Sequence, residues 1–151
     1  FPERGFLLPP EYLLFLQYFR REEEADLLLG MVYLAQNDIS NARIMFQNYV
    51  EASVGDGDTK DGYSPAKGYN GLALCDIAEG NYDSALTNIS SGITVSDTDD
   101  LQSLLFNEVI AYEKKLDFAS ALDKAQTYVG MYPNDADGQK EVAFLKTRTG
   151  A

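Results

Sequence analysis

Carboxylates gather in one glycine-rich stretch that has the residue types of a calcium-binding loop. Asp56, Asp58 and Asp61 offer hard oxygen ligands, which are the ligands that calcium prefers. The spacing departs from that of a calcium loop, because Lys60 stands where a third ligand is needed and Lys67 takes the twelfth position, which requires a bidentate glutamate. The sequence therefore favours a solvated loop over a metal site.

Nucleophilic catalysis lacks its usual base, because the chain contains no histidine. Ser-His-Asp and Cys-His pairs are therefore excluded, and one thiol without imidazole cannot form a zinc site. The single cysteine, Cys75, lies in an apolar helical stretch, where we expect a buried small hydrophobe. Glycine-rich phosphate loops are also missing from the sequence. These features predict a protein that is not an enzyme and uses no cofactor.

The charge of the chain restricts its partners. Its 24 acidic residues outnumber 12 basic ones, and the net charge of -12 opposes nucleic acids and anionic membrane surfaces. No run of about 18 apolar residues occurs, so we expect no membrane insertion. A lone cysteine fits the cytoplasm, but many exported bacterial domains also lack disulfides, so the localisation stays open. The first residue is Phe instead of Met, from which we expect a processed, trimmed or engineered start.

Three polar turns, each followed by a helix start, organise the middle of the chain. Ala42, Ala85 and Ala121 begin corresponding second helices and are separated by 43 and 36 residues. Apolar residues recur at helical spacing around each turn, and strand-type alternation is absent. We therefore expect an all-α fold built from helical hairpins, in which Asp99 or Asp100 caps the first helix of the third hairpin.

A helical-hairpin repeat of about 34 residues resembles the tetratricopeptide repeat (TPR) family. The clearest copy of the family pattern contains Leu29, Gly30, Tyr33, Ala42 and Phe46. The second copy has Asp76 in place of the family's tyrosine. The resemblance implies a right-handed α-α superhelix of about three hairpins, in which small residues allow helices to approach closely.

We expect a single domain over residues 1–151. Its parts are an apolar N-terminal segment at 1–22, repeats at 23–54, 66–97 and 101–134, and a C-terminal capping helix at 137–149. The N-terminal segment has no counterpart in the family pattern and is apolar on nearly every face between Glu11 and Phe19. A helix of this kind must be covered by the repeats or by another chain. The candidate interface residues are Phe6, Tyr12, Phe15, Leu16 and Phe19.

In TPR arrays the first helices of successive hairpins line a concave groove that receives a peptide, and the resemblance implies the same surface here. The candidate groove residues are Leu27, Met31, Leu34, Lys67, Asn70, Leu74, Ile77, Phe106, Ile110 and Glu113. This lining is mostly apolar, with only Lys67 and Asn70 at places where relatives bind a terminal carboxylate. The lining therefore disfavours a carboxylate clamp. The alternative interpretation of Leu34, Leu74 and Ile110 is that they belong to the core between repeats.

The resemblance thus implies a non-enzymatic scaffold that binds a protein or peptide. The first alternative is a self-assembly module, in which residues 1–20 drive formation of a homodimer through a native or engineered interface. The second is an enzyme or carbohydrate-binding protein, which would need a pocket lined by Tyr69, Asp76 and Tyr112.

Overall fold

Helices are the only regular secondary structure among the residues that the structure describes. The computed structural model describes residues 22–54 and 64–150, and no strand occurs in these two ranges. The helices are α2 (Glu22–Ala35), α3 (Ile39–Val54), α4 (Pro65–Glu79), α5 (Tyr82–Val95), α6 (Thr98–Lys114), α7 (Phe118–Met131) and α8 (Ala136–Thr149). The prediction of an all-α fold is confirmed for this part of the chain.

Two predicted features lie outside the described residues. One is the N-terminal interface of Phe6, Tyr12, Phe15, Leu16 and Phe19, and the other is the carboxylate loop of Asp56, Asp58 and Asp61. Both stay predictions.

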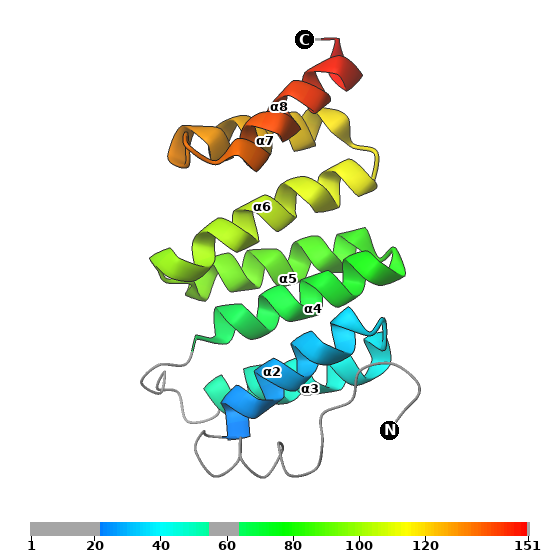
Figure 1. Ribbon diagram of the computed structural model, residues 1–151, viewed down its shortest axis with the longest axis vertical. Coiled ribbons are helices and arrows are strands. Elements are labelled where there is room, and N and C mark those ends of the chain that lie inside the picture. The colour runs from blue at the N-terminus through cyan, green and yellow to red at the C-terminus, as the bar shows by residue number, and fades with distance from the viewer. Residues whose placement is uncertain (1–21, 55–63, 151) are drawn as a thin grey trace.

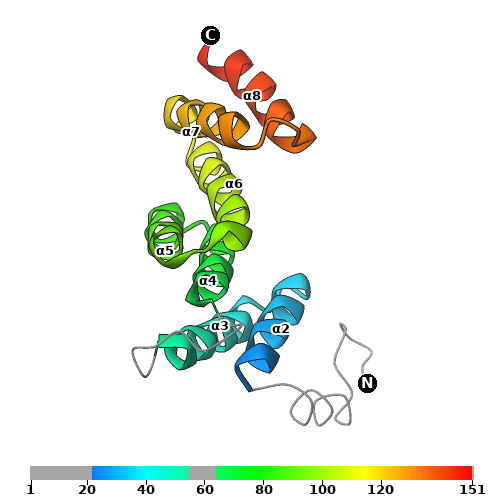
Figure 2. The same ribbon diagram turned by 90° about the vertical axis from the view of Figure 1, so that its left-hand side faces the viewer.

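Consecutive helices pack against each other along the described chain (Figure 1). The pairs α2–α3, α4–α5 and α6–α7 form hairpins, and α8 packs against α7. Helix α4 also contacts α2 and α6, so the first helices of the hairpins touch one another. Figure 2 shows the first helix of each pair on the right of the second. The first helices therefore share one side of the molecule.

The three hairpin turns have the same backbone structure. Asn37, Gly80 and Leu116 adopt positive φ angles of 62°, 81° and 69°. The next amide donates to the carbonyl oxygen five residues earlier over 2.8 to 3.0 Å, in the pairs Asp38–Tyr33, Asn81–Asp76 and Asp117–Tyr112. This hydrogen bond satisfies a carbonyl that the end of a helix leaves free. The repeated polar phrases of the sequence are therefore three copies of one turn.

The apolar core is divided into three clusters along the array, each with one of the predicted alanines. Ala42, Ala85 and Ala121 are fully buried. The buried members of the first cluster are Ala42, Phe46, Leu72 and Cys75. The second cluster contains Ala66, Ala73, Ala85, Ile89, Leu104 and Ala111, and the third contains Val109, Ala121, Leu122, Ala125 and Leu145. The full burial of Cys75 confirms its prediction as a small core residue.

The predicted cap of α6 is wrong by two or three residues. Asp97 is the N-cap, and its Oδ1 accepts hydrogen bonds from the amides of Asp99 and Asp100 at 3.0 and 3.2 Å. A capping side chain must come from the extended residue just before the helix and reach the second and third helical amides. Asp99 and Asp100 supply those amides, so they are the capped residues.

Candidate binding surface

Two neighbouring cavities lie along the side that α2, α4 and α6 share. The larger one has a volume of about 500 Å³ and is called the apolar cavity; its lining includes Leu27, Met31, Leu34, Gly71 and Leu74. The smaller one, of about 360 Å³, is called the polar cavity; its lining includes Gln102, Phe106, Asn107, Tyr128 and Asp135. Asn70, Leu74 and Ser103 line both cavities. The two hollows therefore form one continuous surface.

Most of the predicted groove residues lie on this surface. The apolar cavity is lined by Leu27, Met31, Leu34, Lys67, Asn70 and Leu74, and the polar cavity by Asn70, Leu74 and Phe106. The other three line neither of these two cavities. Ile77 packs against the second core cluster, Ile110 is half-buried, and Glu113 lies beside Glu141 of α8.

Phe46 of α3 lies behind the apolar cavity and explains its shape. The ring is 1% exposed, and it packs against Gly30 of α2 and Gly71 of α4. A Cβ atom at Gly30 would lie 2.6 Å from the ring, and one at Gly71 would lie closer still. Both helices therefore approach the ring closely, because neither has a side chain at the point of contact. Gly71 was missed as a lining residue, although its position in an apolar helix was a usable signal.

The polar groups at the edge of the apolar cavity bond to each other. Lys67 Nζ lies 2.5 Å from Asp100 Oδ1, and Asn107 Nδ2 donates to Asn70 Oδ1 over 2.7 Å. Both interactions join α4 to α6. The two residues that most resembled a carboxylate clamp thus already have partners within the chain.

The polar cavity is built around Tyr128, which the sequence did not reveal as a site residue. Its hydroxyl donates to Asp135 Oδ2 and accepts a hydrogen bond of 3.0 Å from Gln102 Nε2. The rings of Phe106 and Tyr132 lie 5.4 and 5.0 Å from the Tyr128 ring, measured between centroids. Aromatic contacts at these distances favour a fixed arrangement of the rings. The cavity wall is therefore held in place by α6, α7 and the turn before α8.

The hydrogen bond between Tyr128 and Asp135 shifts the pKa of both side chains. Burial raises the pKa of Tyr128, and the hydrogen bond to Asp135 raises it further. The same bond, helped by backbone amides at the start of α8, lowers the pKa of Asp135. A neutral phenol donating to a carboxylate is thus the stable form at neutral pH.

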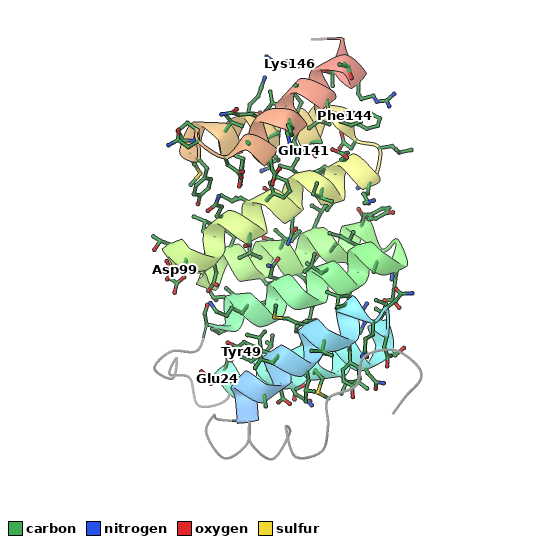
Figure 3. The ribbon with its side chains drawn as sticks, viewed as in Figure 1. Glu24, Tyr49, Asp99, Glu141, Phe144 and Lys146 are labelled. Atoms are coloured by element: carbon green, nitrogen blue, oxygen red, sulfur yellow. The ribbon has the colours of Figure 1, made fainter. Side chains whose placement is uncertain are left out.

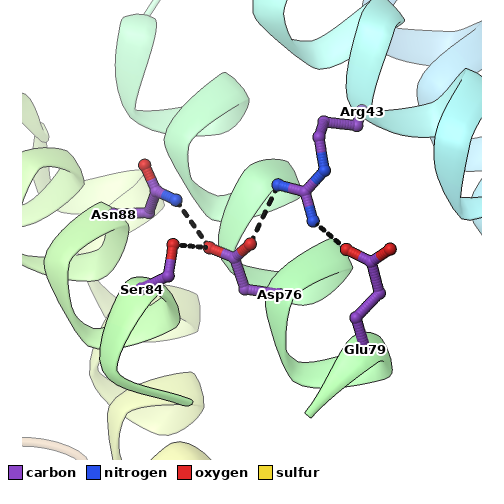
Figure 4. Close-up of polar contacts among 5 residues, drawn as sticks. All are labelled: Arg43, Asp76, Glu79, Ser84 and Asn88. Carbon is purple, nitrogen blue, oxygen red and sulfur yellow. Dashed lines mark hydrogen bonds and ion pairs between the residues drawn. The ribbon is translucent and has the colours of Figure 1, made fainter. Parts of the chain in front are cut away.

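Asp76 is 2% exposed and lies at the centre of a cluster of polar side chains (Figure 4). Its Oδ1 lies 2.8 Å from Arg43 Nη1, and its Oδ2 accepts hydrogen bonds of 2.8 Å from Ser84 and Asn88. Arg43 also pairs with Glu79. A buried carboxylate needs such partners. The cluster joins α3, α4 and α5, so it holds the first hairpin to the second.

The residues of the alternative pocket lie in different surroundings. Tyr69 packs against the first core cluster and Tyr112 against the third, while Asp76 bonds to Arg43, Ser84 and Asn88. None of the three lines the apolar or the polar cavity. The geometry offers no support for a shared pocket of these residues.

Glu113 of α6 and Glu141 of α8 place two carboxyl groups in contact. Figure 3 labels Glu141 on α8. The Oε2 atoms of both carboxyl groups are buried and have no hydrogen-bond partner among the described residues. The contact with Glu113, together with burial and the charge of Asp137, raises the pKa of Glu141 to about 7. A shared proton is therefore favoured at this contact below neutral pH.

Within residues 22–54 and 64–150, no group of three or more Cys, Asp or Glu side chains is arranged to hold a metal ion. No helix in the same ranges is long and apolar enough to span a membrane.

No protein-family model matches the sequence, and no curated protein is significantly similar to it.

Proposed function

We propose that this protein is a non-enzymatic scaffold that binds an apolar segment of a protein or peptide on the surface formed by α2, α4 and α6. The observation that carries the proposal is the apolar cavity, which opens between α2 and α4 and has a volume of about 500 Å³. Cavities of this size with mostly apolar linings are typical of ligand sites. Met31 in this cavity is 56% exposed, so its side chain is open to contact by a ligand.

The arrangement of the hairpins in this proposal is that of a TPR-like right-handed superhelix. Three equivalent turns and three separate core clusters support it, because each hairpin of a repeat protein packs only against its neighbours. In such an array the first helices provide the binding side. The link from this fold to peptide binding is an analogy with the family that the sequence resembles.

A matched pair of surface variants tests the proposal. Met31→Glu places a charge in the apolar cavity, whereas Ile44→Glu places one on α3 at a residue that is 48% exposed and lines neither cavity. Both variants should stay folded, which circular dichroism checks. Pull-down from the source cells with the three proteins should yield partners that Met31→Glu loses and Ile44→Glu keeps. If Met31→Glu retained the same partners as the original protein, the proposal would be wrong.

A further inference from the structure

We propose that the apolar segment Phe6 to Phe19 of this chain occupies the apolar cavity of the same molecule. The inference rests on the proposed function, because both place an apolar segment between α2 and α4. It names the occupant: a neighbouring piece of the same chain covers the cavity when no partner is bound.

The chemistry of the cavity selects an apolar occupant. Its lining on α2 is Leu27, Met31 and Leu34. Of its polar lining residues, Lys67 pairs with Asp100 Oδ1 and Asn70 accepts a hydrogen bond from Asn107, while Asp100 Oδ2 is buried without a hydrogen-bond partner among the described residues. A ligand group that needed the Lys67 ammonium or the Asn70 side-chain oxygen would have to compete with those contacts, whereas an apolar side chain leaves them intact. Of the fourteen residues from Phe6 to Phe19, ten are Phe, Leu or Tyr. Leaving this many large apolar side chains in water is unfavourable, so the segment must be covered.

The length of the chain allows the segment to reach the cavity. Phe19 precedes the first residue of α2, Glu22, by three positions. At 1.5 Å per residue, Leu27 and Leu34 lie about 7 and about 18 Å from the start of α2 along its axis. Pro9 and Pro10 limit a helix to residues 10–19, so the segment spans about 27 Å with that helix and about 45 Å when fully extended. A chain that reverses direction just before α2 therefore reaches the whole cavity in either conformation.

Charge and tethering favour the segment of the same molecule over that of a second copy. Residues 1–20 contain two acidic and two basic side chains, so their net charge is zero, while the whole chain carries -12. Binding between two copies brings two strongly negative molecules together, which electrostatic repulsion opposes. A short tether also gives a segment of the same chain an effective concentration of about millimolar. Binding of the segment within its own molecule is therefore favoured over binding to a second copy at ordinary protein concentrations.

The chain has no tryptophan, so a single introduced indole reports on the segment in the full-length protein. In Phe15→Trp, we expect blue-shifted emission that acrylamide quenches weakly. Adding Met31→Glu should shift the emission to the red and increase the quenching constant about threefold or more, because the charge opposes apolar burial in the cavity. Adding Ile44→Glu should leave both values unchanged. Phe144→Trp on α8, where the native residue is 39% exposed, should not respond to Met31→Glu.

Three results would overturn the inference. They are an exposed indole in Phe15→Trp, a buried indole that does not respond to Met31→Glu, and a burial that depends on protein concentration together with a dimer in light scattering. The last result would assign the cavity to the segment of a second copy. None of these three results changes the outcome of the pull-down comparison. If Met31→Glu still lost a partner there, the proposed function would stand although this inference was wrong.

Discussion

Leu116 occupies a backbone conformation that favours glycine. Its φ is 69°, and the residue is 72% exposed, so little packing compensates for the strain. Gly80 has the same conformation in the second turn without strain, because it has no Cβ. A non-glycine residue in the left-handed region costs about 1–2 kcal/mol. The third turn is therefore held by its hydrogen bonds and by the flanking helices against a local penalty.

Leu116→Gly should stabilise the protein by about 1 kcal/mol, since relief of this strain exceeds the extra freedom of glycine in the unfolded chain. The converse change, Gly80→Ala, should destabilise it by a similar amount. Urea denaturation followed by circular dichroism measures both. A loss of stability in Leu116→Gly would contradict the strain at this turn.

Glu141 links stability to pH. Its pKa is about 7 in the folded chain, mainly because of its contact with Glu113, and 4.5 is the ordinary value for the unfolded chain. The folded state therefore binds the proton more tightly, and this stabilisation is fully present below pH 4.5 and is lost as the pH rises through 7.

Glu141→Gln should remove that dependence. The variant should be more stable than the original protein at pH 8, where Glu141 and Glu113 repel each other, and should differ little from it near pH 4.5. The urea midpoint at the two pH values measures the effect. Asp123→Asn, an exposed change on α7, serves as the control and should leave the pH dependence unaltered. Equal pH profiles for Glu141→Gln and the original protein would refute the contact.

At the scale of the helices, close approach depends on a few small residues. Helices α2 and α4 meet the ring of Phe46 through Gly30 and Gly71, and the same contact shapes the apolar cavity. The packing that stabilises the first hairpin therefore also forms the candidate binding surface.

Gly71→Ala should destabilise the protein by about 1–3 kcal/mol, because the new methyl group overlaps a ring that is 1% exposed and has no room to move. Gly130→Ala on α7 is the matched control. A Cβ there meets nothing within 4 Å, so this change should be neutral or slightly stabilising. Thermal unfolding of both variants measures the difference, and similar melting temperatures would contradict the packing of Phe46.

At the scale of the whole molecule, the core is distributed along the array. Each cluster joins neighbouring helices, and Asp76 bonds with Arg43, Ser84 and Asn88 across three of them. In such a chain, stability is close to a sum of local units and their interfaces. We therefore expect the two ends of the array to open separately.

Cys75 is a natural probe of this behaviour, because it is fully buried in the first cluster and burial raises the pKa of its thiol to about 11. A thiol reagent should label it only when the surrounding helices open. Gly71→Ala should accelerate labelling under native conditions, whereas Leu145→Ala in the third cluster should accelerate it much less. Equal acceleration by the two changes would show that the array opens as one cooperative unit.

The sequence by itself determined the helices, the three turns and the position of the core alanines. These features depend on local chemistry: polar turn residues, apolar side chains at helical spacing and a recurring alanine. The same spacing brought six of the ten groove residues to the apolar cavity, because helical period decides which residues share a face. The local sequence near Ser96 was less informative, and the cap of α6 was assigned to the wrong carboxylates.

Only the tertiary structure decided which partners those faces meet. Lys67 pairs with Asp100 and Asn70 with Asn107 across 33 and 37 residues of sequence, and no local pattern carries that information. The same is true of Asp76, whose place in the repeat is normally tyrosine in the family that the sequence resembles, and which here bonds to side chains from two other helices. Tyr128 and Glu141 likewise owe their hydrogen bonds and shifted pKa values to neighbours that the packing of helices brings close. Periodicity determines the direction of a side chain on its own helix, whereas its partner depends on how the hairpins stack.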